Sequence, residues 1–183
     1  VLPEWLSDPT ATSAVLERFR FEAQVSARLC ERSSHVVAVY DYGTHEGTPY
    51  LVMELVSGRT LEDEIQARGH LPPAEVADIL EQAAQALDTA HALGIVHRDL
   101  KPSNLLVSRT DAGALVVKVA DFGVAKAFSA ELRIDRPRET TAGALVGSPA
   151  FMSPEQIDNR PTLDGRSDVW ALGIVTVRLL TGE

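Results

Sequence analysis

The side chains best suited to chemistry in this sequence lie in one short polar segment and one later triplet. Residues 97–104 read His-Arg-Asp-Leu-Lys-Pro-Ser-Asn, and an Asp-Phe-Gly triplet begins at Asp121. Asp99 can accept a proton from a hydroxyl group, whereas Asn104 and Asp121 offer the hard oxygen atoms that Mg²⁺ prefers. Lys101 can bring a positive charge to a terminal phosphate. Together these groups meet the needs of phosphoryl transfer: an oriented hydroxyl, a divalent metal and cations that offset the developing charge.

The same residue types are also common in polar loops, where Asp frequently forms turns. One such tripeptide alone would leave that structural interpretation open. The complete set, in this order along the chain, favours phosphoryl transfer because each component supplies a different part of one mechanism.

The spacing of apolar residues predicts the elements that must position these groups. We expect helices over 14–30, 61–67, 72–93 and about 167–181, and strands over 36–42, 50–56, 95–96, 105–107 and 116–119. Residues 124–152 are predicted to be irregular, and His91 is interpreted as a packing residue of the long helix. Ser167 or Asp168 is expected to cap the last helix, which is apolar on nearly all sides and so belongs in a core. Two early strands followed mainly by helices predict an α+β fold with unequal parts.

Composition and charge exclude several classes of protein. The chain has 183 residues, 45% of them hydrophobic, which fits one soluble domain with a real core. Its formal net charge of −9 is unsuited to tracking a nucleic-acid backbone, so no nucleic-acid partner is predicted. The longest apolar run, 169–177, is too short to span a bilayer, and no membrane segment is predicted in these residues. A single cysteine, Cys30, excludes an internal disulfide and fits a reducing, cytoplasmic location.

At its motifs the sequence resembles the protein kinase superfamily, and most closely its bacterial serine/threonine branch. The matching segments are the catalytic loop (97–104), the metal-binding triplet (121–123), the end of the activation segment (147–155) and the start of the central helix (168–173). Ser153 stands where many members have Ala. The resemblance implies the two-lobed protein kinase fold, ATP with Mg²⁺ (or Mn²⁺) as cofactors, and proteins with Ser or Thr acceptors as substrates. Lys101, two places after the catalytic aspartate, favours Ser/Thr over Tyr specificity.

The resemblance also assigns roles in the catalytic centre. Asp99 is implied to be the catalytic base, and Lys101 the cation beside the γ-phosphate. Asn104 and Asp121 are implied to hold Mg²⁺. Asp168 is implied to accept backbone N–H groups from the catalytic loop, although an Asp at a helix start is equally suited to capping.

Glu22 has a role that the residues themselves suggest. It falls on the apolar stripe of the helix predicted at 14–30, where an unpaired carboxylate is costly. In the family, the matching glutamate pairs with a strand lysine that grips the α- and β-phosphates of ATP. If the helix is rotated, Glu22 instead pairs with Arg18 on the surface.

The strand predicted at 50–56 ends in residues that match the adenine-binding hinge of the family. Met53 is implied to be the gatekeeper beside the adenine, and the backbone of Glu54 and Val56 to hydrogen-bond to its edge. Leu106 is implied to pack beneath the ring. Without the resemblance these residues would be an ordinary strand end, and that alternative stays open.

Four residues are implied to regulate the kinase. Arg98 precedes the catalytic aspartate, and in the family an arginine there binds a phosphorylated residue of the activation segment. Thr140 and Thr141 are the candidate phosphorylation sites, which implies autophosphorylation, with a dimer as one route. The alternative is that both threonines are incidental residues of a polar loop. Ser148 is implied to help align the catalytic side chains.

By the same resemblance, residues 1–53 are a partial N-terminal lobe, 54–58 the hinge, and 59–183 a helical C-terminal lobe without its last helices. The chain is therefore interpreted as a fragment of a longer kinase, inactive alone, whose missing C-terminal part is a candidate membrane anchor. The main rival is a non-catalytic, pseudokinase-like binding module. A small-molecule phosphotransferase is a weaker rival, because the segment 153–155 shapes a docking surface for polypeptides.

Overall fold

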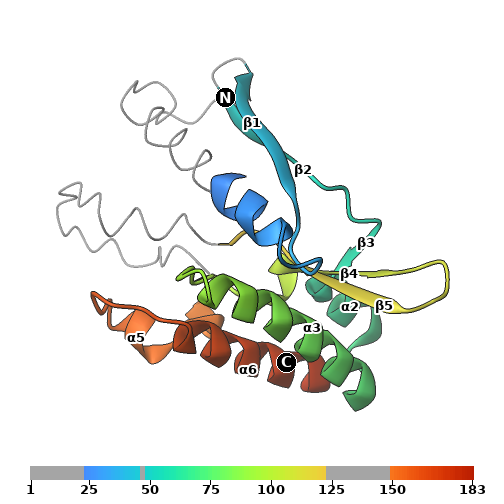
Figure 1. The fold of residues 1–183 in the computed structure, drawn as a ribbon. Coiled ribbons are helices and arrows are strands. Elements are labelled where there is room, and N and C mark those ends of the chain that lie inside the picture. The colour runs from blue at the N-terminus through green and yellow to red at the C-terminus, as the bar shows by residue number, and fades with distance from the viewer. Residues whose placement is uncertain (1–22, 46–47, 123–148) are drawn as a thin grey trace.

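The computed structural model describes residues 23–45, 48–122 and 149–183 (Figure 1). Within them, a two-stranded sheet stands above a three-stranded sheet, and two long helices run side by side beneath the latter (Figure 1). This arrangement is the α+β fold that the order of strands and helices predicts.

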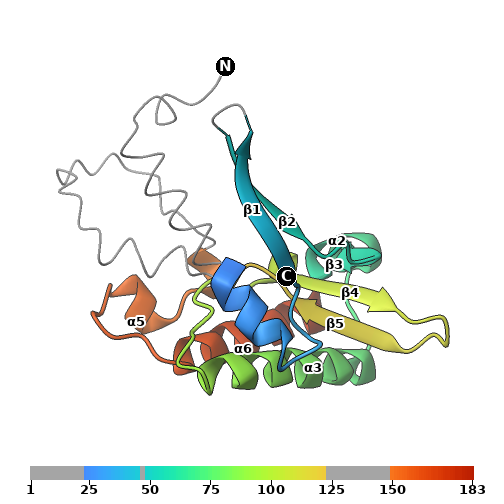
Figure 2. The ribbon, with the colours of Figure 1, turned by 45° about the horizontal axis from the view of Figure 1, so that its top comes forward.

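The smaller sheet is a single hairpin. It consists of β1 (Val39–His45) and β2 (Thr48–Met53), which pair antiparallel. A helix over residues 23–30 lies beside it (Figure 2). Large side chains such as those of Tyr40 and Val52 are exposed on the hairpin, so it contributes little to the core.

The strands predicted at 36–42 and 50–56 are both displaced toward the hairpin turn in the structure. The residues before β1 pair with the other sheet instead: Val36 forms a parallel bridge with Val119, and the N–H of Val37 donates to the carbonyl oxygen of Val119 at 2.9 Å. Both valines are buried. Their β-propensity therefore reflects packing against the larger sheet rather than membership of the hairpin.

The larger sheet has the order β3-β4-β5, with antiparallel neighbours. Its strands are β3 (Gly58–Thr60), β4 (Leu105–Arg109) and β5 (Leu115–Val119). The sequence predicts β4 and β5 but not β3, because three residues are too few to show the alternation of apolar and polar side chains that marks a strand. A Cβ atom at Gly58 would lie 1.9 Å from the carbonyl oxygen of Val107, so glycine is required for β3 to approach β4.

Helix α2 (Leu61–Arg68) follows β3 directly and confirms the helix predicted at 61–67. Its start is fixed by a capping box. The Thr60 hydroxyl accepts from the N–H of Asp63, and the Asp63 carboxylate accepts from the N–H of Thr60, each at 3.1 Å.

Helices α3 (Pro73–His91) and α6 (Arg166–Thr181) form the centre of the core. One side of α3 packs against β5 and another against α6. The fully buried side chains include Ile79, Ala83 and Ala90 of α3, Val117 and Val119 of β5, and Val175 and Leu179 of α6. The long helix predicted at 72–93 is thereby confirmed to within two residues at its C-terminal end.

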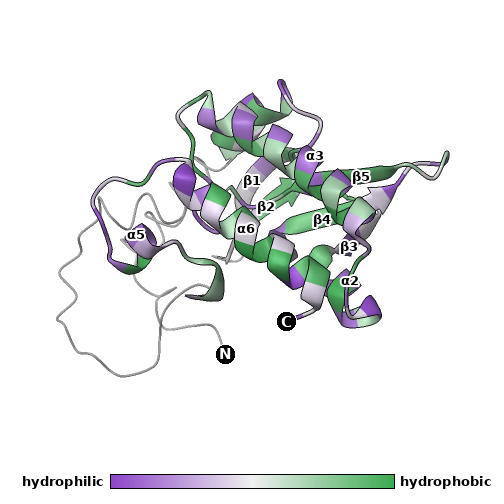
Figure 3. Ribbon diagram, turned by 90° about the horizontal axis from the view of Figure 1, so that it is seen from below, coloured by the Kyte–Doolittle hydropathy of each residue, from purple (hydrophilic) through white to green (hydrophobic). Residues whose placement is uncertain are grey.

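The expected cap of α6 is wrong, whereas its expected place in the core is confirmed on one side of the helix. Gly165, rather than Ser167 or Asp168, occupies the N-cap position, and no side chain caps the helix. The helix is also not buried all round, and hydrophobic residues occur along its whole length in Figure 3. Its exposed apolar side chains are Val169 (64%), Trp170 (46%), Val177 (55%) and Leu180 (40%).

Three short elements complete the described part: η2 (Pro102–Asn104), η3 (Pro149–Phe151) and α5 (Pro154–Ile157). The strand predicted at 95–96 does not form, because the N–H of Ile95 donates to a carbonyl oxygen at the end of α3. Among the residues described, no helix combines the length and the hydrophobicity needed to cross a membrane.

Candidate active site

The carboxylate of Asp168 holds the start of the catalytic loop. Asp168 lies in the first turn of α6 and is 1% exposed. One oxygen accepts from the N–H of His97 at 2.9 Å, and the other from the N–H of Arg98 at 2.8 Å. The role that the family resemblance implies for Asp168 is confirmed by these two bonds. They matter because Arg98 has a φ of 66°, a left-handed conformation that is strained for a residue other than glycine.

A third donor reaches the same carboxylate. Nε2 of His91, at the end of α3, lies 2.7 Å from the Asp168 carboxylate. Gly165 makes room for the His91 ring, since a Cβ atom there would lie 2.6 Å from it. The interpretation of His91 as a packing residue is therefore incomplete: it is a hydrogen-bonding residue that links α3 to α6. No local sequence signal indicates this, because the two partners are 77 positions apart.

His97 joins the catalytic loop to the residues before Asp121. Its Nε2 donates to the carbonyl oxygen of Ala120 at 2.9 Å, and its Nδ1 accepts from the N–H of Asp99 at 3.3 Å. Burial lowers the pKa of His97, despite the opposing effect of nearby carboxylates. The neutral imidazole is the form that both bonds require. Its ring also packs against Phe122, with the ring centres 4.9 Å apart.

The structure brings Asp99, Lys101 and Asn104 together. Nζ of Lys101 lies 3.0 Å from a carboxylate oxygen of Asp99, and both side chains are about a quarter exposed. The side-chain amide of Asn104 donates to the carbonyl oxygen of Asp99 at 2.9 Å. The carbonyl oxygen of Asn104 in turn accepts from the N–H of Ala120 at 2.9 Å, which brings Asp121 next to this group.

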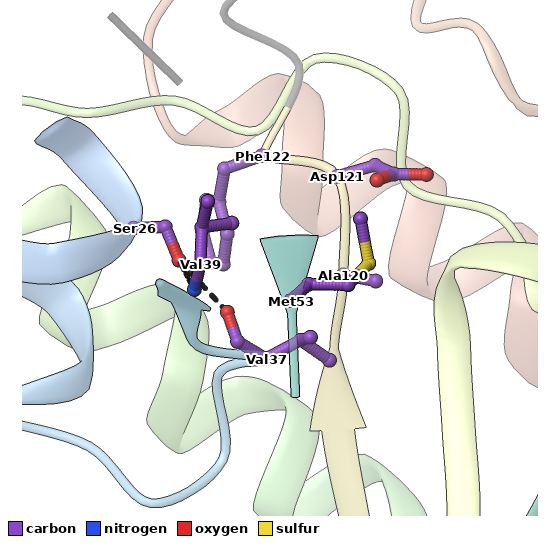
Figure 4. Close-up of a pocket in the computed structure, with 7 residues that line it drawn as sticks. All are labelled: Ser26, Val37, Val39, Met53, Ala120, Asp121 and Phe122. Atoms are coloured by element: carbon purple, nitrogen blue, oxygen red, sulfur yellow. Dashed lines mark hydrogen bonds between the residues drawn. The ribbon is translucent and has the colours of Figure 1, made fainter. Parts of the chain in front are cut away.

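The oxygen atoms of Asn104 and Asp121 suit a magnesium ion. The side-chain nitrogen of Asn104 donates to the carbonyl oxygen of Asp99. The side-chain oxygen Oδ1 is therefore the atom of Asn104 that can bind a metal ion. Asp121 is exposed and has a φ of 53°. In Figure 4 its carboxylate points away from the side on which the Phe122 ring lies. Mg²⁺ is commonly held by one or two such oxygen ligands together with substrate phosphates, so this donor set fits the ion.

A small pocket lies beside Asp121 (Figure 4). It encloses about 20 Å³, close to the space that a single water molecule needs, so it does not itself hold a nucleotide. Its lining residues are Ser26, Val37, Val39, Met53, Ala120, Asp121 and Phe122. The Ser26 hydroxyl donates to the carbonyl oxygen of Val37 at 2.8 Å and accepts from the N–H of Val39 at 3.1 Å. These bonds tie the helix over residues 23–30 to the chain that leads into β1.

Among the described residues, two backbone groups of the hinge expected after Met53 have no hydrogen-bond partner. The N–H of Glu54 donates to the carbonyl oxygen of Ala38 at 2.8 Å, and the carbonyl oxygen of Val56 accepts from the N–H of Gly58 at 2.9 Å. Within the described part of the chain, no hydrogen bond involves the carbonyl oxygen of Glu54 or the N–H of Val56. These two groups are an acceptor and a donor of the kind that the edge of an adenine requires.

The side chain of Glu54 turns toward the larger sheet. Nζ of Lys118 on β5 lies 2.8 Å from its carboxylate, and the two side chains are 18% and 25% exposed. The same carboxylate accepts from the N–H of Ala38 at 3.3 Å. Leu106 is the cross-strand partner of Lys118. Directly paired residues lie on one face of a sheet, so Leu106 is on the face that carries this ion pair.

Ser153, which replaces a common alanine, is a hydrogen-bonding residue in the structure. It is fully buried, and its hydroxyl lies 3.1 Å from the hydroxyl of Ser167. Ser167 donates to the Glu155 carboxylate at 2.7 Å, which lowers the pKa of Glu155. These contacts fix α5 against the start of α6.

Several expected site residues lie outside the described residues. They are Glu22, Thr140, Thr141 and Ser148. Their assigned roles stay predictions.

The geometry of this site can be compared with known proteins. A family model described as the protein kinase domain matches residues 7–183. This chain belongs to the protein kinase family. The kinase domain of PknI from Mycobacterium tuberculosis, a solved structure, covers 100% of the chain with a TM-score of 0.69 at 28% identity. The protein kinase fold that the motifs imply is thereby confirmed.

Similar kinases in other bacteria carry serine/threonine names. The serine/threonine-protein kinase PknB of Mycobacterium leprae is 44% identical over 170 residues, which are 91% of this chain and 25% of that protein. The serine/threonine-protein kinase PknL of Mycobacterium tuberculosis is 43% identical over 168 residues, which are 92% of this chain and 39% of that protein. This chain also covers 62% of the PknI kinase domain. It therefore spans about a quarter to two-fifths of the length of these curated relatives.

Proposed function

We propose that this kinase domain transfers the γ-phosphate of ATP to serine or threonine hydroxyls of proteins. The observation that carries the proposal is the grouping of Asp99, Lys101 and Asn104 within hydrogen-bond distance of one another, next to Asp121. The serine/threonine class rests on the lysine two places after Asp99 and on the names of PknB and PknL.

Each residue has a distinct role in this proposal. Asp99 orients the acceptor hydroxyl and takes its proton, while Lys101 offsets charge on the transferred phosphoryl group. Asn104 and Asp121 would hold Mg²⁺, which supplies neutralisation of the phosphate charges when bound. The ion pair of Lys101 with Asp99 supports these assignments, because it sets the lysine beside the base before any substrate is present.

The nucleotide would lie along the hinge. The carbonyl oxygen of Glu54 and the N–H of Val56, which have no partner among the described residues, would bond to the adenine edge, with Met53 beside the ring and Leu106 beneath it. Glu22 would support a phosphate-gripping lysine. In this proposal the chain consists of a partial N-terminal lobe (1–53), a hinge (54–58) and a C-terminal lobe (59–183).

Regulation forms a second part of the proposal. Arg98 would bind a phosphate on Thr140 or Thr141, and Ser148 would help align the catalytic side chains. Autophosphorylation between two copies is one route to that state.

The test uses the natural protein that contains this chain, with Mg-ATP and a basic protein as acceptor. Asp99→Asn is expected to lower kcat at least about 100-fold with little change in the Kd for ATP, since Asp99 contacts the acceptor rather than the nucleotide. Asp121→Asn is expected to weaken Mg-ATP binding. Asp111→Asn, in the exposed turn after β4, is the matched control and should change neither quantity. Equal loss of nucleotide binding in both site variants would refute the assignment.

A binding-only function is a second candidate for the 183 residues by themselves. Their three lysines, Lys101, Lys118 and Lys126, all follow the hinge, so none can come from a strand before Glu22. A polypeptide of these residues alone is therefore expected to transfer phosphate negligibly, because positioning of the phosphates supplies most of the catalysis. Labelled ATP, Mg²⁺ and a basic protein would test this. Sustained transfer above the Asp99→Asn background would contradict it.

A further inference from the structure

Gln156, in α5, forms a direct bond to the catalytic loop. Its Nε2 donates to the carbonyl oxygen of Arg98 at 2.7 Å, although the two residues are 58 positions apart. The other end of the same amide is also used. Its Oε1 accepts from the N–H of Ser153 at 3.0 Å and from the Ser153 hydroxyl at 3.2 Å, in the capping box of α5. The orientation of the Gln156 amide is thus fixed from both sides.

The residue that Gln156 holds is the strained one. Arg98 has its left-handed φ of 66°, and its N–H is already bonded to Asp168. Its carbonyl oxygen is bonded to Gln156. Both backbone polar groups of Arg98 are therefore fixed by side chains, one from α6 and one from α5. A strained backbone persists where surrounding contacts over-determine it, and these two bonds are such contacts.

The bond also fixes Asp99. The carbonyl group of Arg98 and the N–H of Asp99 belong to one planar peptide unit, so they cannot rotate independently. At the opposite edge of the same plane, the N–H of Asp99 donates to Nδ1 of His97. Rotation of the plane would break both bonds and redirect the Asp99 side chain.

We propose that Gln156 is a positioning residue for Asp99, which acts by clamping the peptide unit between Arg98 and Asp99. The clamp couples α5 to the base, because α5 is itself fixed by the contacts among Ser153, Ser167 and Glu155. A shift of α5 would therefore rotate the peptide that carries the base. Only the catalytic consequence of the clamp rests on the proposed function; the clamp itself does not.

The decisive variant is Gln156→Glu. A glutamate of the same shape keeps an oxygen that accepts from Ser153, so the capping box of α5 survives. It loses the donor to the carbonyl oxygen of Arg98 and places an acceptor against it. The substitution thus removes the clamp and leaves the helix cap in place.

The chain offers a matched control in Gln82→Glu. Gln82 on α3 also accepts a backbone N–H through Oε1, from Val117 at 2.9 Å, and donates through Nε2, to the carbonyl oxygen of Leu115 at 3.2 Å. The same amide-to-carboxylate change there removes an equivalent bond away from the catalytic loop.

Amide hydrogen exchange on the full 183-residue chain tests the clamp without any activity. In Gln156→Glu, the amides of residues 97–101 are expected to exchange roughly 5- to 10-fold faster, the loss of protection that one hydrogen bond supplies. Gln82→Glu should leave these amides unchanged and affect β5 instead. Unchanged exchange at 97–101 in Gln156→Glu would overturn the proposal, as would an equal increase in the control.

Two further measurements separate the clamp from folding and from function. In the unmodified chain, nuclear Overhauser contacts are expected between the Gln156 carboxamide protons and the backbone protons of Arg98 and Asp99. Their absence would refute the clamp even if a variant fails to fold.

In the natural protein, Gln156→Glu should lower kcat about tenfold with unchanged KM for ATP. If the unmodified protein shows no transfer, the proposed function fails while the exchange result still decides the clamp. A normal kcat alongside loosened exchange would overturn the catalytic part alone.

Discussion

The sheet of β1 and β2 and the sheet of β3, β4 and β5 lie close together but are stabilised in different ways. The larger sheet packs its apolar face on α3, and Leu105, Val117 and Val119 are fully buried there. The hairpin instead leaves Tyr40 68% and Val52 42% exposed. Burial of aliphatic side chains thus holds the larger sheet, whereas the hairpin has little buried apolar surface of its own.

Polar contacts attach the hairpin region to the rest of the molecule. They are the Ser26 bonds, the pairing of Val36 and Val37 with Val119, and the ion pair between Glu54 and Lys118. The catalytic loop, in contrast, is fixed by Asp168 of α6, by Gln156 of α5 and by the carbonyl oxygen of Ala120 after β5. The catalytic loop is therefore anchored mainly by other elements than those that hold the residues proposed to bind adenine, and the two groups should respond differently to mutation.

Hydrogen exchange gives the largest expected contrast between the two regions. In the 183-residue chain, amides of residues 76–91 in α3 are expected to exchange at least about 100-fold more slowly than those of β1 and β2, because a hairpin with few buried contacts opens locally. Mass spectrometry of peptic fragments would measure both segments in one sample. Slow and equal exchange in the two would show that the hairpin is as well packed as the helix.

The ion pair between Glu54 and Lys118 provides a way to weaken the connection itself. Lys118→Met keeps the length of the side chain but leaves the partly buried Glu54 carboxylate unpaired, and should lower the free energy of unfolding by about 1–3 kcal/mol. Arg160→Met is the matched control, because the ion pair of Arg160 with Asp158 is exposed and should contribute less than about 1 kcal/mol. Urea denaturation would compare the two variants. Equal, small losses would mean that the hairpin is attached by other contacts.

The smallest expected effect is a pH dependence that arises in the catalytic region. Burial lowers the pKa of His97 below its usual 6.5 in the folded chain, against the opposing effects of Asp168, Asp99 and Asp121. Below pH 6.5 the unfolded chain then binds more protons, so stability is highest above that pH and falls as pH decreases, by at most about 1.4 kcal/mol per pH unit for this one group.

Urea denaturation of the chain and of His97→Asn at pH 7.5 and 5.5 isolates this contribution. The carboxyl groups whose pKa is lowered, Asp63, Glu75 and Glu155, start from usual values of 3.8 to 4.5 and remain charged in this range. The unmodified chain should lose more stability than the variant between the two pH values. Parallel losses would exclude His97 as the titrating group.

The grouping of Asp99, Lys101 and Asn104 next to Asp121 was predictable from sequence, because the phosphoryl transfer proposed for them dictates their residue types. Their individual roles in that reaction stay predictions. The long helix was predictable for a different reason: its apolar period and its proline start are local properties.

Several of the missed features depend on partners far away in the chain. Nothing near His91 or Gln156 in the sequence indicates bonds to Asp168 or to the Arg98 carbonyl group, 77 and 58 positions away. Likewise the start of β1 depends on Val36 pairing with Val119 rather than with β2. Local sequence patterns determine the propensity for a helix or a strand, whereas tertiary contacts determine which distant residues pair with each other.

The three hydrogen-bond donors on Asp168 also limit where additional residues can be inserted into this domain. Since His91 and His97 bond to the same carboxylate, the number of residues between them is fixed, and one added residue would separate a donor from its acceptor. Among the described residues, no contact fixes the length of the turn between β4 and β5 in this way. This turn is exposed and closed by its own backbone bonds around Gly113, with a φ of 82°. A reporter peptide or a ligand-sensing module is therefore best grafted there, where the chain can lengthen without reaching the catalytic centre.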